Sequence, residues 1–310
     1  MSETSTSEQG SPGQRGVRLP FPGIRVGVGE DPTGPTGCTV LDFGSPVRVA
    51  RDPRGGSVCW SGDFPSVHAL CLAGGSVYGL EAISGVAAEL LHRRGDRVHW
   101  SDLALVSGAC AYDFASRSTS AYPTMDLGRA ALLDATTPEV PVGRRGAGSA
   151  TLVGAGIPGL QPEPGGQGAA AAVLGELAVA VVTVVNALGA VRDREGRVVR
   201  GHLDPATGLR HRAVDRAAST LTAPPMDVPA GNTTLTVLVT NARLDDRALT
   251  QLGRQVHGSM ARAIEPFSTL YDGDLLWAVT TDDGPAGLDV SALGTVASEL
   301  AWDAVLSAVR

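Results

Sequence analysis

Two runs of small and β-branched apolar residues constrain the fold more than any other feature of this sequence. Residues 178–185 read AVAVVTVV and residues 234–240 read TLTVLVT. The first run is nearly continuous in Val and Ala, which is typical of a strand that is covered on both faces. The second run is strongly β-branched and also predicts a strand. Such strands need helices or another sheet on each side, so the runs predict a layered α/β fold with mixed sheets between helices.

The remaining patterns place helices and further strands around these two runs. Apolar residues recur every three or four positions over residues 76–92, which predicts an amphipathic helix that ends at Gly95. The stretch 168–190 is expected to form a buried strand with a helix before it, and the polar stretch 192–229 a functional or mobile loop. A Gly-Ser-Pro turn is expected to separate two strands at 39–43 and 47–51. Further helices are expected at 126–133, 246–264 and 291–309, and further strands at 58–60, 103–112 and 269–280.

Composition and charge exclude several classes of function. The 310 residues are 43% hydrophobic and 18% charged, which predicts a compact fold. All 25 cationic residues are Arg, so a lysine Schiff base, a lysine general base and a P-loop are excluded. The formal net charge of −7 gives no electrostatic reason to bind nucleic acid or an anionic membrane. We therefore expect a small or neutral substrate.

The order of polar and apolar segments predicts one large domain. Residues 1–22 are polar and rich in Ser and Gly, which predicts a disordered tail, and residues 23–310 are expected to form a single catalytic domain. The tail has no apolar signal region, so we expect a cytoplasmic location. Polar residues interrupt the stretch 168–190, which argues against a membrane span. Four cysteines without CxxC spacing are expected to be free thiols.

The boundary between the polar stretch and the second strand carries the sharpest candidate for chemistry. Gly231 and Asn232 tolerate positive φ, so a strained turn there can hold the Asn232 carbonyl against the Thr233 hydroxyl. Attack by the hydroxyl would move the acyl group from nitrogen to oxygen, and hydrolysis of the ester would free the amine of Thr233. An α-amine with a pKa of roughly 7.7–8.0 can then serve as the base for its own hydroxyl. The alternatives are an ordinary turn that enters a strand and an unused glycosylation sequon.

Other catalytic motifs are incomplete. A G-x-S-x-G elbow around Ser76 fails at Tyr78, the six His residues show no HExxH spacing, and a G-x-G-x-x-G pattern at 146–151 fails at its last position. We therefore expect no metal and no other cofactor. The Gly-Gly-Ser turn at 74–76 opens the predicted helix, so Gly75 and Ser76 are candidates to present backbone N–H groups to a substrate. Helix capping by Ser76 is the alternative.

Three blocks of the sequence together resemble a known family. They are LAGGSVYGLEAISGV at 72–86, GNTTLTVLVTNARL at 231–244 and RQVHGSMARAIEPFSTLYDGDLLWAVTT at 254–281. They are similar to the DmpA-type peptidases, a family of self-processing N-terminal nucleophile amidohydrolases. Within that family, the NTTLTVLVTN form looks most like the nylon-oligomer (6-aminohexanoate-oligomer) endohydrolases. The resemblance extends from about Gly23 to Val309.

The resemblance implies a fold, a self-cleavage and a reaction. The fold is a four-layer αββα sandwich of the kind shared with ornithine acetyltransferases. The chain is expected to cut itself between Asn232 and Thr233, into an α chain of residues 1–232 and a β chain of residues 233–310, and to hydrolyse amide bonds with Thr233 as the nucleophile. Family members form closed tetramers, so a homotetramer of such α-β heterodimers is expected, with the helix at 291–309 as a candidate contact surface.

The resemblance also assigns roles to further side chains. Asp272 and Asp274 match the carboxylates that orient the nucleophile, although a DGD segment is also compatible with a solvated turn or a metal loop. Asn186 matches an Asn whose amide donates to the oxyanion, and a buried Asn bonded to backbone is the alternative. Tyr112 matches a Tyr near the nucleophile, and a core aromatic is the alternative.

One departure from the family concerns a lysine. Related nylon-oligomer hydrolases carry a Lys in a VG-containing block, whereas this chain reads Val153-Gly154-Ala155 and has no Lys. Arg144 or Arg145 can supply a positive charge there, but an Arg does not exchange a proton as Lys does.

Three other functions stay open from the sequence. They are an aminopeptidase that acts on short peptides or β-peptides, an acyltransferase of the ornithine-acetyltransferase type, and an unprocessed assembly protein without catalysis. The first two share amide or ester chemistry at Thr233, whereas the third predicts an intact chain.

Overall fold

One long strand, β3 (Thr36–Pro53), belongs to both sheet layers of the molecule. The computed structural model describes residues 16–222 and 232–310. The first half of β3 pairs with β2 (Arg25–Asp31) and β5 (Ser66–Ala73), and the second half pairs with β16 (Leu275–Thr280). The strand order is β10-β11-β14-β16-β3-β5-β6-β4, with β10 at Gly166–Leu174, β11 at Leu177–Val185, β14 at Leu235–Thr240, β6 at Val106–Cys110 and β4 at Trp60–Ser61.

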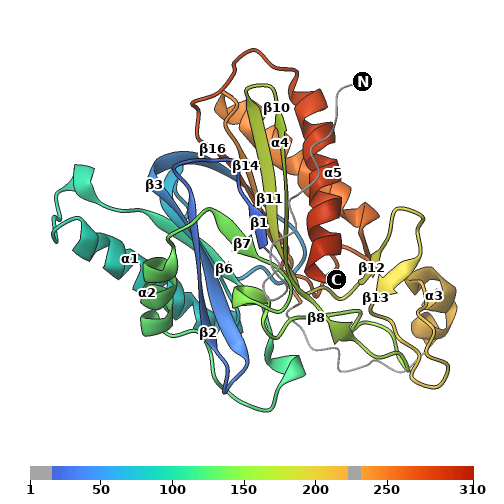
Figure 1. Ribbon diagram of the computed structural model, residues 1–310. Helices are drawn as coiled ribbons and strands as arrows, with labels where there is room; N and C mark the ends of the chain where they lie inside the picture. Colours follow the sequence, from blue (N-terminus) through green and yellow to red (C-terminus); the bar gives the residue numbers. More distant parts are fainter. Residues whose placement is uncertain (1–15, 223–231) are drawn as a thin grey trace.

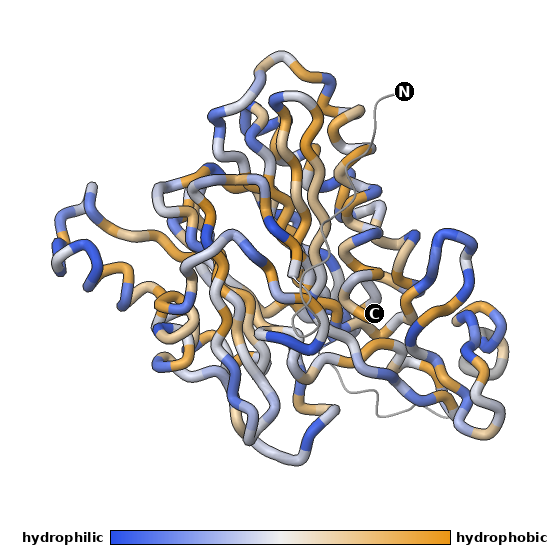
Figure 2. The backbone as a smooth tube through the Cα atoms, in the orientation of Figure 1, coloured by the Kyte–Doolittle hydropathy of each residue, from blue (hydrophilic) through white to orange (hydrophobic). Residues whose placement is uncertain are grey.

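Alternating side chains divide the core into three apolar layers. In β11, Ala180 and Val182 face the other sheet layer, whereas Val179 and Val181 face the helices α4 (Asp246–Ser259) and α5 (Val290–Ala308). Helices α1 (Leu80–Arg93) and α2 (Met125–Asp134) cover the opposite layer. The arrangement is the predicted αββα sandwich (Figure 1), and the hydropathy colouring shows the apolar strands at its centre (Figure 2). Each strand run is buried on both faces because a sheet lies on one side and helices on the other.

The helices predicted at 76–92, 126–133, 246–264 and 291–309 are confirmed, with shifted ends. The helix expected at 76–92 begins with a 3-10 turn, η1 (Ser76–Gly79), and Gly95 follows its end with φ of 71°. The other short elements are β7 (Glu139–Pro141), β8 (Leu152–Val153), β9 (Glu163–Pro164), η2 (Trp100–Asp102), η3 (Phe114–Ser116), η4 (Gly146–Gly148) and η5 (Met260–Arg262). Among the described residues, no helix has both the length and the apolar character needed to span a bilayer.

The Gly-Ser-Pro segment at 44–46 does not separate two strands. It lies inside β3, where the register against β5 shifts between Asp42 and Val47. Gly44 has φ of 69°, which a glycine adopts without a steric penalty, and its N–H donates to the Asp42 carboxylate at 2.9 Å. A bulge therefore takes the place of the expected turn, and the chain continues into the second sheet layer.

The segment before β11 is a strand and not the predicted helix. β10 and β11 form a hairpin whose two connecting residues are Gly175, with φ of 62°, and Glu176. A Cβ on Gly168 would lie 2.0 Å from the Ala304 carbonyl oxygen of α5. The Gly and Ala residues of β10 thus let a helix pack closely on the sheet, and their helical propensity is overridden by that contact.

Two boundaries predicted from polarity are also wrong. Residues 16–18 form β1 (Gly16–Arg18), which pairs with β7, and Leu19 and Phe21 are buried, so any tail is shorter than residues 1–22. Residues 1–15 lie outside the described residues. The stretch 192–229 is structured up to residue 222, with β12 (Ala190–Arg192), β13 (Val198–Arg200) and α3 (Ala213–Thr222), and its last residues lie outside the described ones.

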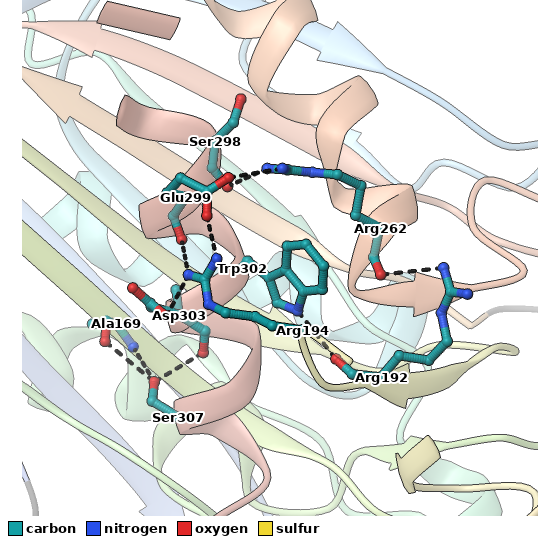
Figure 3. A network of polar contacts seen from close by, with 10 residues as sticks. Ala169, Arg192, Arg194, Arg262, Ser298, Glu299, Trp302, Asp303 and Ser307 are labelled. Carbon is teal, nitrogen blue, oxygen red and sulfur yellow. Dashed lines mark hydrogen bonds and ion pairs between the residues drawn. The ribbon is translucent and has the colours of Figure 1, made fainter. Parts of the chain in front are cut away.

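Polar contacts fasten the small sheet β13-β12-β15 to α5, with β15 at Ile264–Glu265 (Figure 3). Arg194 pairs with Glu299 and with Asp303, and Trp302 donates its indole N–H to the Arg192 carbonyl at 3.1 Å. The Arg194 guanidinium also lies 5.1 Å from the centre of the Trp302 ring. The ion pairs are partly exposed and each contributes about 0–1 kcal/mol, so their main effect is to fix the position of this outlying part.

Candidate active site

Parallel pairing of β14 and β16 brings the two chemistry-bearing segments together. Asn232 and Asp272 form a parallel bridge that extends the ladder beyond the named strands. Thr233 is 2% exposed and Asp274 is fully buried. Segments far apart in the sequence therefore lie side by side because adjacent parallel strands begin at the same edge of a sheet.

The peptide group between Asn232 and Thr233 is held on both sides by backbone. Its carbonyl oxygen, on Asn232, accepts the Gly273 N–H at 2.6 Å, and its N–H, on Thr233, donates to the Asn186 carbonyl at 2.5 Å. A Cβ on Gly273 would lie 2.9 Å from Thr233 Oγ1 and 2.4 Å from the Ser57 carbonyl oxygen. Only glycine leaves room for the Thr233 hydroxyl in this arrangement.

The carboxyl group of Asp274 is buried and accepts a hydrogen bond from Thr234, the residue after Thr233. Its Oδ1 accepts the Thr234 N–H at 2.7 Å, and its Oδ2 accepts the Ser268 N–H at 3.1 Å and the Ser268 hydroxyl at 3.3 Å. Burial, with the charge of Asp272 as a second cause, raises the pKa of Asp274 to about 8. Asp274 therefore retains its proton near neutral pH.

The Asp272 carboxylate fastens two other segments. Its Oδ2 accepts the Thr269 N–H at 2.8 Å and the Thr269 hydroxyl at 2.7 Å, and its Oδ1 accepts the Leu188 N–H at 3.2 Å. Ser268 and Thr269 are not among the residues predicted from sequence, although hydroxyl side chains a few positions before an Asp are a recognisable pattern for local carboxylate bonding.

Asn186 contacts Thr233 through its backbone and not through its side chain. The side-chain oxygen accepts the Leu152 N–H at 2.9 Å, and the side-chain amide donates to the Tyr112 carbonyl at 2.9 Å. The Asn186 amide thus joins β8, β11 and the segment after β6 around the nucleophile candidate. These contacts position the three segments.

Tyr112, whose carbonyl accepts a hydrogen bond from the Asn186 amide, adjoins the turn at 74–76. The Tyr112 ring contacts Phe114 edge to face, with 5.6 Å between the ring centres. The Gly75 N–H donates to Asp113 at 3.0 Å and the Ser76 N–H donates to the Ala111 carbonyl at 3.0 Å. Both N–H groups therefore have internal acceptors, and Ser76 makes no side-chain cap either. A role of Gly75 and Ser76 in substrate binding stays a prediction.

An aromatic cleft of about 560 Å³ lies next to this turn. Tyr78, Phe114, Arg117 and Tyr122 contribute to its lining. The Arg117 guanidinium is buried, pairs with Asp113 at 2.8 Å and covers the Phe114 ring at 4.2 Å. The cleft adjoins the Tyr112 side of the Thr233 site through the contact between Tyr112 and Phe114.

The two arginines that could supply the charge of the family lysine are engaged elsewhere. Arg145 pairs with Glu30 at 2.8 Å, and Arg144 donates to the Ser149 carbonyl at 3.0 Å. Val153 forms a bridge with Ala187, directly after Asn186, and Gly154 donates to the Ala187 carbonyl at 3.1 Å. The block in which relatives carry a Lys thus borders the site.

Two buried polar atoms at the start of β14 have no hydrogen-bond partner among the described residues. They are the Asn232 side-chain nitrogen and the Thr234 hydroxyl. Buried polar groups without partners are rare in folded proteins, and they concentrate where chemistry or binding takes place. Together with the raised pKa of Asp274, they distinguish this junction from an ordinary turn.

Two solved structures share the fold of this chain. A β-aminopeptidase of Burkholderia sp. aligns with a TM-score of 0.67 at 18% identity, over 96% of this chain and 89% of that one. The L-aminopeptidase D-Ala-esterase/amidase of Ochrobactrum anthropi, described as a variant of the Ntn hydrolase fold, aligns with a TM-score of 0.66 at 16% identity, over 95% and 87%. The fold is that of the N-terminal nucleophile hydrolases.

The sequence comparisons then give the family. Residues 62–310 match peptidase family S58, and the chain belongs to that family. It is 44% identical to a 6-aminohexanoate-oligomer endohydrolase of Paenarthrobacter ureafaciens, over 96% of this chain and 87% of the relative. It is also 35% identical to an uncharacterized aminopeptidase of Mycobacterium bovis, over 94% and 84%. Hydrolysis of amide bonds is the reaction class that the family and these relatives support.

Proposed function

We propose that this chain cuts its own peptide bond between Asn232 and Thr233 and then uses Thr233 to hydrolyse amides, in particular 6-aminohexanoate oligomers by internal cleavage. The observation that carries the proposal is the geometry of that bond, whose carbonyl accepts the Gly273 N–H at 2.6 Å while Gly273 packs against the Thr233 hydroxyl. The name of the relative at 44% identity supports the substrate class.

Self-cleavage proceeds in two steps in this proposal. Thr233 Oγ1 attacks the Asn232 carbonyl carbon, and the Gly273 N–H stabilises the oxyanion. The C–N bond breaks, the proton of the Thr233 hydroxyl passes to the Thr233 nitrogen, and an ester remains between the Asn232 acyl group and the Thr233 oxygen. Water hydrolyses that ester and leaves a new carboxylate on Asn232 and a free α-amine on Thr233.

The freed Thr233 then repeats the chemistry on a substrate amide. Its α-amine takes the hydroxyl proton, the oxygen attacks the substrate carbonyl, and the amine portion of the substrate leaves with that proton. Water then hydrolyses the acyl ester on Thr233, which releases the carboxylic acid and restores the Thr233 hydroxyl. The Asn186 carbonyl, which accepts the Thr233 N–H in the uncut chain, is placed to accept a hydrogen bond from the new amine. Asp272 and Asp274 hold the segments on both sides, and Tyr112 carries the carbonyl to which Asn186 is anchored.

Aminopeptidase activity on short peptides or β-peptides is the second candidate, supported by the 35%-identical relative that is named an aminopeptidase. We retain the sequence-based predictions of a cytoplasmic location and of a homotetramer of cut chains as parts of the proposal. An acyltransferase would transfer an acyl group to an amino acid in an activity assay. A non-catalytic assembly protein would remain an intact chain.

Mass spectrometry of the purified protein tests the proposal. We expect two polypeptides, residues 1–232 and 233–310, whose masses add to that of the chain plus one water. Linear 6-aminohexanoate oligomers with blocked and free amino ends are then compared, since internal cleavage does not require the free amine. A protein that stays whole while it hydrolyses amides would contradict the mechanism, and a cut protein that accepts only free amino ends would favour the aminopeptidase.

A further inference from the structure

A second pocket, of about 290 Å³, lies between α3 and the segment that follows β11. Its walls include Ile157, Leu188, Leu221 and Pro266, and the one polar side chain that the described residues contribute to it is His202. The volume is at the lower end of the range for small-molecule sites, which suits one segment of a chain and not a whole large ligand.

This pocket adjoins the acyl side of the bond at Thr233. Leu188 forms part of its wall and donates its N–H to the Asp272 carboxylate at 3.2 Å. Asp272 in turn forms a bridge with Asn232, which is the acyl residue of the bond between Asn232 and Thr233. The aromatic cleft near Tyr112 lies on another side, because it reaches the site through Asn186 and not through Asp272.

His202 is an unusual residue for an apolar wall. It is fully buried and its backbone is left-handed with φ of 48°. Its ring nitrogens make no well-aligned hydrogen bond among the described residues, although backbone groups of His211 and Leu188 lie close to them. A left-handed backbone at a residue other than glycine costs roughly 1–3 kcal/mol, and such strain concentrates at ligand sites. Burial lowers the pKa of His202, so the ring is neutral at pH 7. A neutral imidazole has one donor and one acceptor, which are the complement of an amide N–H and C=O.

We propose that this pocket is the acyl-side subsite for an aliphatic segment of the substrate, and that His202 recognises a second amide group in that segment. The inference rests on the proposed function, and it gives the substrate class a physical reason. An oligoamide carries amides separated by apolar methylene chains, which is the alternation that an apolar pocket with one imidazole would recognise.

Filling the pocket from α3 tests its occupancy. Ala213 lies in the wall, whereas Ala218 is on the same helix, exposed and outside the lining, so Ala213→Leu and Ala218→Leu form a matched pair. With acyl p-nitroanilides of increasing chain length, we expect Ala213→Leu to raise KM about tenfold for hexanoyl and longer chains and to leave acetyl substrates and self-cleavage unchanged. Equal effects of the two substitutions at every chain length would overturn the subsite.

Substitution of His202 tests amide recognition separately. The readout is the ratio of kcat/KM for an acyl chain with an internal amide to that for an all-carbon chain of equal length, which cancels a general loss of folded protein. We expect His202→Leu to lower this ratio about three- to tenfold and His202→Gln to restore part of it. An unchanged ratio in His202→Leu contradicts the role of the imidazole.

Direct binding separates failure of the subsite from failure of the proposed function. N-acetyl-6-aminohexanamide serves as the probe in calorimetry with wild type and with Ala213→Leu. Binding to wild type that is weakened in Ala213→Leu supports the pocket even in a protein that neither cuts itself nor hydrolyses amides. No binding to wild type, or equal binding to both, overturns it.

Discussion

The two ends of β14 carry the same residue types in different states. At its C-terminal end, the Thr240 hydroxyl donates to the Ala178 carbonyl at 3.1 Å, and the Asn241 side chain bonds Ala178 N–H at 2.9 Å and the Glu176 carbonyl at 2.9 Å. At its N-terminal end, the Asn232 side-chain nitrogen and the Thr234 hydroxyl are buried without a partner within 16–222 or 232–310.

This difference separates a strand end with satisfied polar atoms from the strand end at which we propose the reaction. A Thr-Asn pair whose polar atoms are all bonded fixes a turn and contributes only to stability. The Asn-Thr-Thr end instead lies beside the Asp274 carboxyl, whose pKa is raised, and two of its polar atoms have no hydrogen-bond partner among the described residues. Residue type alone does not distinguish the two ends, whereas the state of their polar atoms does.

The largest expected effect comes from the nucleophile itself. Thr233→Ala removes the attacking oxygen, so we expect no self-cleavage and amide hydrolysis at background level. Thr234→Val removes the neighbouring hydroxyl, which has no hydrogen-bond partner in the described part of the chain, and this variant should still be cut. Gel electrophoresis and mass spectrometry check both proteins. Cleavage of the Thr233→Ala protein would contradict the assignment of Thr233 as the nucleophile.

A smaller effect is expected at Gly273. The added Cβ of Gly273→Ala would meet Thr233 Oγ1 and the Ser57 carbonyl, so the bond is displaced from its oxyanion donor. Displacing such a donor costs about 10²–10³ in rate, and we expect self-cleavage to slow about 100-fold. Gly258→Ala is the control because its Cβ has only ordinary contacts, 3.6 Å from Arg54. Time courses of self-cleavage compare the two variants. Equal rates would contradict the proposed role of the Gly273 N–H as oxyanion donor.

The Asp274 carboxyl predicts a pH dependence of stability. Its pKa is about 8 in the folded chain, whereas an exposed Asp in the unfolded chain has its ordinary value of 3.8, so the folded state keeps a proton that the unfolded state loses. The stabilising contribution is therefore complete below pH 3.8 and declines as the pH rises to about 8. In the uncut Thr233→Ala background, we expect Tm to fall over this window and to fall less in the additional Asp274→Asn variant. A steeper decline in that variant would refute the assignment.

The smallest effects concern stability at the two ends. Thr240→Val removes a buried hydrogen bond to the Ala178 carbonyl, which then has one hydrogen-bond donor fewer. The free energy of unfolding should therefore fall by about 1–3 kcal/mol. Thr234→Val removes a hydroxyl without a partner within the described chain and should be neutral or stabilising. Denaturant titration measures both, and the reverse order would erase the contrast between the ends.

Much of the fold follows from the sequence because the strands and helices carry clear periodicities. The run at 178–185 predicts β11 and the run at 234–240 predicts β14. The sequence predicts a helix in place of β10 because its Gly and Ala residues show no alternation of polar and apolar side chains. These small residues instead allow α5 to pack closely on the strand. It predicts a turn in place of the bulge at Gly44 because a Gly-Ser-Pro segment is compatible with both. The pairing of β3 with β5 on both sides of this segment shows that the chain does not reverse there.

The candidate site is predicted less completely, since its contacts are made largely by backbone. The residue types of Asn232, Thr233 and Asp274 can be selected from the family resemblance. The contact from Asn186 comes from its carbonyl, and the proposed oxyanion donor at Gly273 is a backbone N–H. Backbone groups leave no signature in side-chain identity. His202 is not predicted as a site residue because a lone His in sequence gives no sign of its surroundings.

The position of β14 and β16 in the sheet has a consequence for the product of the proposed self-cleavage. Both strands belong to the C-terminal piece, and they lie between β11 and β3 of the N-terminal piece. Release of the C-terminal piece would have to break two complete ladders and uncover the faces of α4 and α5 at once. The severed polypeptides should therefore co-purify as one particle, exchange no subunits with added fragments, and separate only under conditions that denature the whole protein.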